Sequence, residues 1–187
     1  NLHALEAVLA EVDDATPDEI WCLGDVVGYG PRPNECADLV RDRSDVVLVG
    51  NHDLAAIGRL STADFGPLAS ASAHWTASEL TSTNAGWLES LRPEATRPGA
   101  ELYHGSPRDP VWEYVLSEEV ARACLLETSA SVVLVGHSHL ALALLLTDDR
   151  VEGGLAPAGT DADLGRGWFL LNPGSVGQPR DGHPRAA

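Results

Sequence analysis

The fold of this chain is decided by the stretch Val46-Val47-Leu48-Val49-Gly50-Asn51-His52-Asp53, where four apolar β-forming residues end at a glycine and three reactive side chains follow. A short β-branched run that ends at a glycine is typical of a buried strand in an α/β sheet. In such sheets, ligands bind just beyond the carboxyl ends of the strands. We therefore predict that residues 46–49 form a buried strand and that residues 51–53 lie at a functional site.

The same pattern of an apolar run, a glycine and a polar side chain recurs three more times. A single Gly-Asp or a single histidine after a strand is usually a turn residue or a hydrogen-bonded histidine. Four such endings in one chain, which repeatedly use Asp, Asn and His, instead indicate a metal site. The other three endings are Ile20-Trp21-Cys22-Leu23-Gly24-Asp25, Glu101-Leu102-Tyr103-His104-Gly105 and Val132-Val133-Leu134-Val135-Gly136-His137-Ser138-His139.

Length and composition fit one acidic domain. The chain has 187 residues, of which 44% are hydrophobic, and this is enough for a sizeable core. Its formal net charge of −16 argues against bulk binding to nucleic acid or to anionic membranes. No apolar run approaches the roughly 20 residues of a membrane helix, and no signal peptide is visible. We therefore expect a cytoplasmic protein.

The remaining sequence pattern alternates helices and strands. Apolar residues at helical spacing predict a helix over residues 2–12, and Asn34 is placed to cap a helix after the rigid loop 28–33. Residues 54–91 favour interrupted helices, and Ser117 is placed to cap a later helix. Further strands are expected at residues 20–23, 102–104, 132–135, 140–147 and 168–171, whereas residues 148–167, rich in Gly, Pro and Asp, are expected to be an irregular loop and the segment most prone to disorder.

The residue types at the strand ends narrow the choice of metal. Asp, Asn and His without cysteine favour Mn²⁺, Fe, Zn²⁺ or Ni²⁺ over a structural zinc. In an extended chain, His137 and His139 would project to the same side and serve two ions about 3.5–4 Å apart. Asp25 is able to bridge such a pair of ions. Adjacent side chains diverge, so a metal-bound Asn51 would leave His52 free to donate a proton.

The polar strand endings, taken in chain order, resemble the motifs of the calcineurin-like metallophosphoesterases. These endings are Gly24-Asp25, Gly50-Asn51-His52-Asp53, His104 and Gly136-His137-Ser138-His139. Gly24-Asp25-Val26-Val27-Gly28-Tyr29-Gly30-Pro31 and residues 172–182 are similar to the small stand-alone prokaryotic phosphodiesterase branch of that superfamily. The resemblance spans nearly the whole chain and implies one calcineurin-like phosphoesterase domain over residues 1–187. It also implies an α/β fold of the metallophosphoesterase type, an α/β/β/α sandwich of two mixed sheets flanked by helices, with a di-metal site at the strand ends.

The resemblance implies a role for each metal ligand. Asp25 would bridge two divalent metal ions. Asn51, His104 and His137 would complete the coordination of one ion, and His139 would belong to the other. A hydroxide held between the metals, its pKa lowered toward about 7, would attack phosphorus in line.

The resemblance also implies which residues meet the substrate, a small phosphate ester. His52 would contact the phosphate and protonate the leaving group, and Asp53 would orient its imidazole. Such a general acid typically contributes about 10²–10⁴-fold to the rate. Asn51 and Arg108, which lies four residues after His104, are further candidates for substrate contact.

The chain departs from the family pattern at both ends. The family opens with Asp-x-His-Gly-Asn, and Asn1 stands where that Asn falls, so we expect the first strand with its Asp and His to be missing. The second metal site would then be incomplete, with only Asp25 and His139, and we expect one metal to bind well and the second poorly. Relatives continue with a closing strand beyond residues 184–186, and His183 stands where Asp or Asn is expected.

Three functions agree with these motifs. A metal-dependent phosphoesterase acting on phosphodiesters or small phosphomonoesters explains all of them. A phosphoprotein phosphatase would use the same metal centre, although the chain has little extra surface for docking a protein. A non-catalytic metal-binding scaffold of the same fold would have no reason to keep His52 beside Asp53, and both are present. The sequence leaves the substrate, the metal and the oligomeric state open.

Overall fold

The computed structural model describes residues 1–182, which fall into two compact units. Unit 1 contains Asn1–Arg92 and Val176–Gln178, and unit 2 contains Pro93–Ser175 and the chain from Pro179 onward. His183 and the expected closing strand lie outside the described residues. No helix within residues 1–182 combines the length and the apolar character that crossing a bilayer requires.

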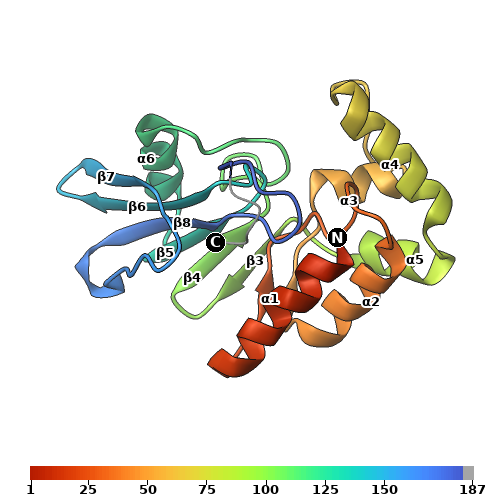
Figure 1. Cartoon of the computed structure of the whole chain (residues 1–187). Coiled ribbons are helices and arrows are strands. Elements are labelled where there is room, and N and C mark those ends of the chain that lie inside the picture. The colour runs from red at the N-terminus through yellow and green to blue at the C-terminus, as the bar shows by residue number, and fades with distance from the viewer. Residues whose placement is uncertain (183–187) are drawn as a thin grey trace. The chain divides into compact units, whose positions relative to one another are not determined.

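Unit 1 is mainly helical (Figure 1). It also holds a two-stranded parallel sheet. β1 pairs with β2, with Trp21 opposite Val46. The core of this unit joins the loop after β1 to three helices through Val27, Ala37, Ala56 and Leu88. The elements are α1 (Leu2–Ala15), β1 (Trp21–Cys22), α2 (Pro33–Arg43), β2 (Val46–Val47), α3 (Asn51–Ala56), α4 (Pro67–Glu79) and α5 (Ser82–Ser90).

The stretch at residues 46–49 is buried and extended, as predicted, although only its first half pairs in the two-stranded sheet. Leu48 and Val49 are almost completely buried. The Leu48 amide donates to the Cys22 carbonyl, and the Val49 amide donates to the Arg92 carbonyl. This segment is therefore bonded on both sides, which fixes the point at which the chain turns into α3.

The helix α2 begins at Pro33, and the prediction that Asn34 caps it is wrong. Arg32 occupies the N-cap position with a φ of 65°. Pro33 suits the first helical position because that position needs no amide donor. The Asn34 side chain instead bonds to the junction between α4 and α5, where its oxygen accepts from the amide of Thr81, the N-cap of α5, at 2.9 Å and its nitrogen donates to the carbonyl of Glu79, the last residue of α4, at 2.8 Å.

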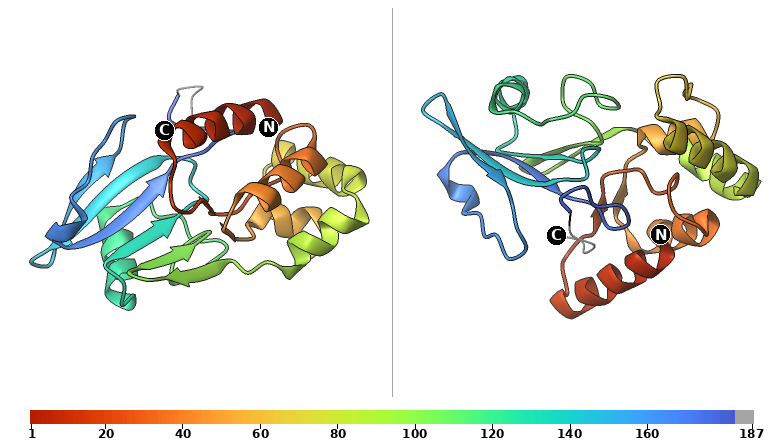
Figure 2. Two further views of the ribbon diagram at one scale, coloured as in Figure 1. Left: turned by 90° about the horizontal axis from the view of Figure 1, so that it is seen from below. Right: turned by 45° about the horizontal axis from the view of Figure 1, so that its top comes forward.

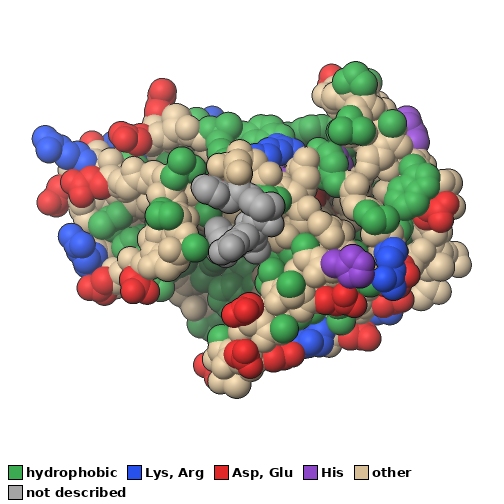
Figure 3. All heavy atoms as spheres, in the orientation of Figure 1, with side chains coloured by type: hydrophobic (Ala, Val, Ile, Leu, Met, Phe, Trp, Pro, Cys, Tyr) green, Lys and Arg blue, Asp and Glu red, His purple; other side chains and the backbone are tan. Residues whose placement is uncertain are grey.

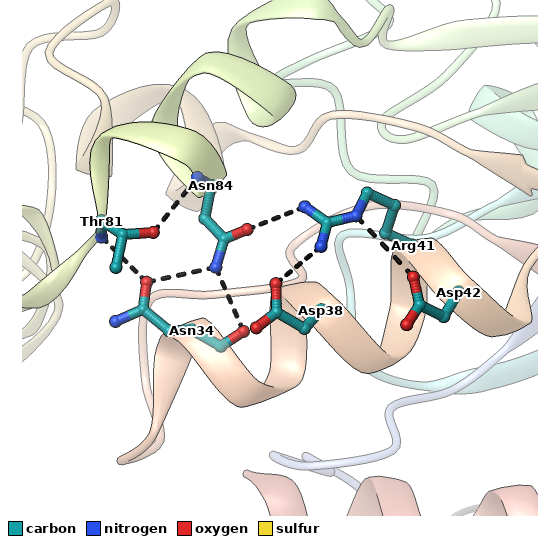
Figure 4. A network of polar contacts seen from close by, with 6 residues as sticks. All are labelled: Asn34, Asp38, Arg41, Asp42, Thr81 and Asn84. Atoms are coloured by element: carbon teal, nitrogen blue, oxygen red, sulfur yellow. Dashed lines mark hydrogen bonds and ion pairs between the residues drawn. The ribbon is translucent and has the colours of Figure 1, made fainter.

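A buried side chain, Asn84, joins α5 to α2 (Figure 4). Its amide nitrogen lies 3.3 Å from both the carbonyl and the side-chain oxygen of Asn34. Its oxygen accepts from Arg41 at 3.0 Å, and Arg41 also pairs with Asp38 at 2.8 Å. Each polar atom of this buried amide therefore has a partner.

Asn84→Ala is expected to lower the free energy of unfolding by about 1–3 kcal/mol, because the buried Asn84 amide and its bonds to the half-buried Asn34 and Arg41 would be lost. Chemical denaturation followed by circular dichroism measures this change. Asp42→Asn is the control, since the Asp42 carboxylate lies 3.8 Å from Arg41 and its side chain is 72% exposed. The control should change stability by less than about 0.5 kcal/mol. Equal effects of the two variants would contradict the prediction.

Unit 2 is built on a six-stranded mixed sheet with the order β3-β4-β5-β8-β6-β7. The central strands β4, β5 and β8 run parallel, and the outer pairings are antiparallel. The helix α6 covers one face of this sheet (Figure 2), over a core formed with β5, β6 and β8. The elements are β3 (Glu94–Arg97), β4 (Ala100–Tyr103), α6 (Glu118–Glu127), β5 (Val132–Val135), β6 (Ala141–Thr147), β7 (Arg150–Leu155), the short 3-10 helix Leu164–Arg166 and β8 (Trp168–Pro173).

The predicted start of α6 is confirmed. The Ser117 side chain accepts a hydrogen bond from the Val120 amide at 3.3 Å. Glu118 and Glu119 stand in the first turn, where the positive end of the helix dipole favours carboxylates. The cap ends the loop that leads from β4 into α6, and that loop carries several residues of the candidate site.

The prediction that residues 148–167 form an irregular loop is wrong for its first part, because Arg150–Leu155 forms β7 and pairs antiparallel with β6. The hairpin turn consists of Asp148 and Asp149, whose φ angles of 46° and 70° match the tight turn that joins twisted strands. Gly153 suits this strand because a Cβ there would lie 2.1 Å from a backbone oxygen of β6. Gly153 is required by the close approach of the two strands. Composition alone does not distinguish such a glycine from one in a loop.

Charged side chains are interspersed on the face drawn in Figure 3. Carboxylates lie beside arginines there, and all 12 basic residues of the chain are arginine. The expectation of no bulk nucleic-acid binding stays a prediction.

Candidate functional site

In unit 1, the carboxylate of Asp25 lies against the backbone of Gly50. Asp25 follows β1 with a φ of 53°, and its Oδ1 accepts from the His52 amide at 2.9 Å. A Cβ at position 50 would lie 2.1 Å from that oxygen. Only glycine therefore fits between β2 and α3 unless the carboxylate of Asp25 moves.

The Asp53 carboxylate joins two loops of unit 1. Its Oδ1 accepts from the Val27 amide and its Oδ2 from the Gly50 amide, both at 2.9 Å. Burial, together with the nearby charge of Asp25, raises the pKa of Asp53 to about 7. These bonds fasten the loop after β1 to the turn before α3. The expected orientation of His52 by Asp53 stays a prediction.

The imidazole of His52 is buried among aromatic rings of unit 1. Its centroid lies 4.2 Å from that of Tyr29 and 4.8 Å from that of Phe65. Gly28 backs onto it so closely that a Cβ there would lie 2.7 Å from the His52 Cβ. The motif around Gly28 and Tyr29 thus helps to form the pocket of His52.

Residues 51–53 form the first turn of α3 instead of an extended strand end. Gly50 is the N-cap, and the Asp53 carboxylate bonds back to its amide. Successive side chains on a helix point about 100° apart. Asn51 and His52 therefore diverge as expected, although the geometry that separates them is helical.

In unit 2, two buried imidazoles lie side by side at the ends of parallel neighbours. The ring centroids of His104, after β4, and His137, after β5, are 5.1 Å apart with an interplanar angle of 60°. The His104 carbonyl also accepts from the Gly136 amide at 2.9 Å. Two tilted imidazoles at this spacing suit neighbouring ligands of one ion.

The turn at residues 137–139 is not extended, so the reasoning that placed His137 and His139 on one side of a strand is wrong. Both residues have a φ of 59°. The Ser138 amide donates to the Gly136 carbonyl at 2.6 Å. The Asn172 side chain donates to the same carbonyl at 2.6 Å and to the Ser138 hydroxyl at 3.0 Å. Asn172 therefore holds this turn, a role that the sequence analysis missed.

Two aromatic residues that the sequence analysis also missed surround His137. Tyr114 stacks on its ring with centroids 3.9 Å apart at 25°, and Trp112 approaches edge-on at 6.2 Å. Both stand in the loop between β4 and α6, which also carries Arg108. In the sequence, the only indication was that two aromatic residues, Trp112 and Tyr114, alternate with other residues in this loop. The local sequence does not indicate that they contact His137.

The family model of the calcineurin-like phosphoesterase superfamily domain matches residues 1–187. This chain belongs to the calcineurin-like phosphoesterase superfamily. The resemblance read from the sequence motifs is thereby confirmed.

This calcineurin-like chain is similar to three known proteins. The crystal structure of a metallophosphoesterase from Sphaerobacter thermophilus is 41% identical, with a TM-score of 0.88, over 100% of this chain and 77% of that one. An uncharacterised protein of Methanocaldococcus jannaschii is 35% identical over 198 residues, which cover 100% of this chain and 76% of the relative. A hypothetical protein from Pyrococcus horikoshii shares the fold, with a TM-score of 0.69 at 19% identity over 93% and 72% of the two chains.

The predicted fold class is confirmed. The calcineurin-like chain is mixed α/β with two sheets and flanking helices, and it matches the metallophosphoesterase fold. The superfamily uses divalent metals, and the donors present in each unit suit such ions. Unit 1 offers the Asp25 carboxylate, and unit 2 offers the paired imidazoles of His104 and His137. Hard oxygen and imidazole donors without thiolate suit catalytic divalent ions.

Proposed function

We propose that this protein is a metal-dependent phosphoesterase that hydrolyses phosphodiesters or small phosphomonoesters. One observation carries the proposal: the backbone amide of buried His52 donates to the carboxylate of Asp25 at 2.9 Å. This bond fixes the backbone that carries the candidate proton donor next to the candidate metal ligand, in a member of this superfamily. A scaffold without catalysis would have no need for a histidine at this position.

The proposed centre is binuclear, with two divalent ions held by carboxylate, amide and imidazole ligands. Asp25 and Asn51 come from unit 1, and His104, His137 and His139 come from unit 2. The assignment rests on the ligand types, on their places at element ends within each unit, and on membership of the superfamily. When bound, divalent ions such as Mn²⁺ would supply Lewis-acid activation of a water molecule and of the phosphoryl oxygens.

His52 has the role of general acid in this proposal. Its imidazole would hold a proton and deliver it to the leaving oxygen of the ester. The rings of Tyr29 and Phe65 keep the imidazole in place. Asp53 contributes by fastening the start of α3 to the loop after β1, so that Asp25 and His52 keep their relative positions.

Metal removal tests the proposal. The purified protein is treated with a chelator and then supplied separately with Mn²⁺, Fe²⁺, Zn²⁺ or Ni²⁺. Each form is assayed with bis-p-nitrophenyl phosphate, p-nitrophenyl phosphate and a phosphopeptide. We expect chelation to abolish turnover, Mn²⁺ to restore it, and the small esters to be hydrolysed faster than the phosphopeptide.

Two outcomes would contradict the proposal. A preference for the phosphopeptide would indicate a phosphoprotein phosphatase. Tight metal binding without turnover of any ester would indicate a scaffold that keeps the fold and the ligands alone.

A further inference from the structure

The loop that follows His104 in unit 2 is closed by its own hydrogen bonds. The Gly105 amide donates to the Pro110 carbonyl at 2.7 Å, and the Ser106 amide donates to the Asp109 carbonyl at 3.0 Å. A Cβ at Gly105 would lie 2.6 Å from the Asp109 carbonyl oxygen. The Asp109 side chain accepts from the amides of two following residues, Val111 and Trp112, at 3.1 and 3.0 Å. The loop is therefore a compact element with a defined shape.

The hydroxyl of Ser106 is the centre of this loop. The side chain is completely buried. Its Oγ accepts from the amides of Arg108 and Asp109, both at 3.1 Å, and donates to Oε2 of Glu113 at 2.5 Å. Ser106 thus fixes the backbone on which Arg108 stands and, at the same time, one oxygen of Glu113.

Glu113 is held from a second side by the core of unit 2. The thiol of Cys124 in α6 lies 3.8 Å from Oε2 of Glu113. Burial, with the charge of Glu113 adding to it, raises the pKa of Cys124 to about 11, so the thiol stays protonated and donates. The other oxygen, Oε1, lies 3.2 Å from Nη2 of Arg108. One carboxylate oxygen is thus anchored to Ser106 and Cys124, and the other faces Arg108.

We propose that Glu113 is a positioning residue that holds the guanidinium of Arg108 ready for the phosphate group of the substrate. The inference rests on the proposed phosphoesterase function. A guanidinium has five N–H donors, and the pairing with Glu113 leaves most of them for phosphate oxygens. The Arg108 side chain is 39% exposed, whereas that of Glu113 is 20% exposed. The less exposed, anchored Glu113 therefore orders the more exposed Arg108 side chain before substrate arrives.

Preorganisation of this kind affects substrate affinity. Ordering one rotamer-rich side chain on binding costs about 0.5–1.5 kcal/mol, which corresponds to about 2–13-fold in affinity. Glu113→Gln keeps an oxygen that accepts from Ser106 and removes the negative charge that holds Arg108. We expect this variant to raise KM for bis-p-nitrophenyl phosphate about 5–10-fold and to leave kcat within about twofold.

A double-mutant cycle separates positioning from general destabilisation. Arg108→Gln should raise KM at least as much as Glu113→Gln, and the double variant should behave like Arg108→Gln alone. Asp149→Asn is the matched control, because Asp149 pairs with Arg122, whose side chain is 40% exposed. The control should leave KM unchanged. Thermal unfolding of each variant checks that the fold is kept.

Binding of inorganic phosphate to the Mn²⁺-loaded protein is measured in the same variants, so the inference does not depend on turnover alone. We expect Glu113→Gln to weaken phosphate binding about 5–10-fold, again only when Arg108 is present. An inactive wild type would overturn the proposed function but would leave this measurement decisive for Glu113. Unchanged phosphate affinity in Glu113→Gln, or additive losses in the double variant, would overturn the inference.

Discussion

His52→Gln is expected to lower kcat for phosphodiester hydrolysis by on the order of 10²–10⁴-fold while the metal content stays unchanged. The reason is the separation of roles within α3. The His52 amide bonds to Asp25, whereas its imidazole lies between Tyr29 and Phe65. The substitution keeps the amide bond to Asp25 and removes the proton donor. Steady-state kinetics and elemental analysis of the same preparation measure the two quantities.

Comparing esters with different leaving groups makes the test of His52 more specific. A general acid matters most when the departing oxygen is a poor leaving group, so the loss should be larger for an alkyl phosphodiester than for bis-p-nitrophenyl phosphate. His74→Gln is the matched control, since His74 belongs to the same unit and contacts only the Thr62 hydroxyl, at 3.5 Å, among its hydrogen bonds in the described chain. Equal losses for both ester types, or unchanged turnover, would remove His52 from the role of general acid.

Asp25→Asn is expected to weaken metal binding by more than about 100-fold and to abolish turnover. Even partners one step removed from a metal typically contribute 10–100-fold to its affinity, and a ligand that bridges two ions should contribute more. Asparagine has the same shape and tolerates the left-handed backbone, for which φ is 53° at this position. The variant therefore loses one negative charge and keeps the local fold. Isothermal titration with Mn²⁺ measures the effect.

Asp148, in the hairpin of unit 2, provides a matched control for this prediction. Asp148 also has a left-handed backbone, with a φ of 46°, and lies in the turn before β7. Asp148→Asn should leave metal affinity and turnover unchanged. Wild-type Mn²⁺ affinity in Asp25→Asn would show that Asp25 is not a metal ligand, and the binuclear centre proposed here would then have to be abandoned.

Local sequence patterns predicted the elements whose formation depends on neighbouring residues. The buried run at residues 46–49, the strand Val132–Val135 and the Ser117 cap of α6 follow from hydrophobic spacing, β-branched side chains and a hydroxyl at a helix start. The hairpin strand β7 was missed because the need for Gly153 comes from a backbone on the neighbouring strand. The Asn34 cap failed for a similar reason, since its side chain bonds to Glu79 at the end of α4 and to Thr81, the N-cap of α5.

For the site, the sequence by itself determined which reactive residues stand at which element ends, and the order of these motifs determined the superfamily. Both are properties of short segments, in which glycines and ligand residues follow apolar runs. Only the tertiary structure showed that Asp53 joins two loops through backbone amides, that Asn172 holds the turn at His137, and that Glu113 pairs with Arg108. The bonds from Val27 to Asp53 and from Asn172 to Gly136 join segments far apart in the chain, and the pairing of Glu113 with Arg108 depends on how the loop between them folds. Local sequence patterns contain neither kind of information.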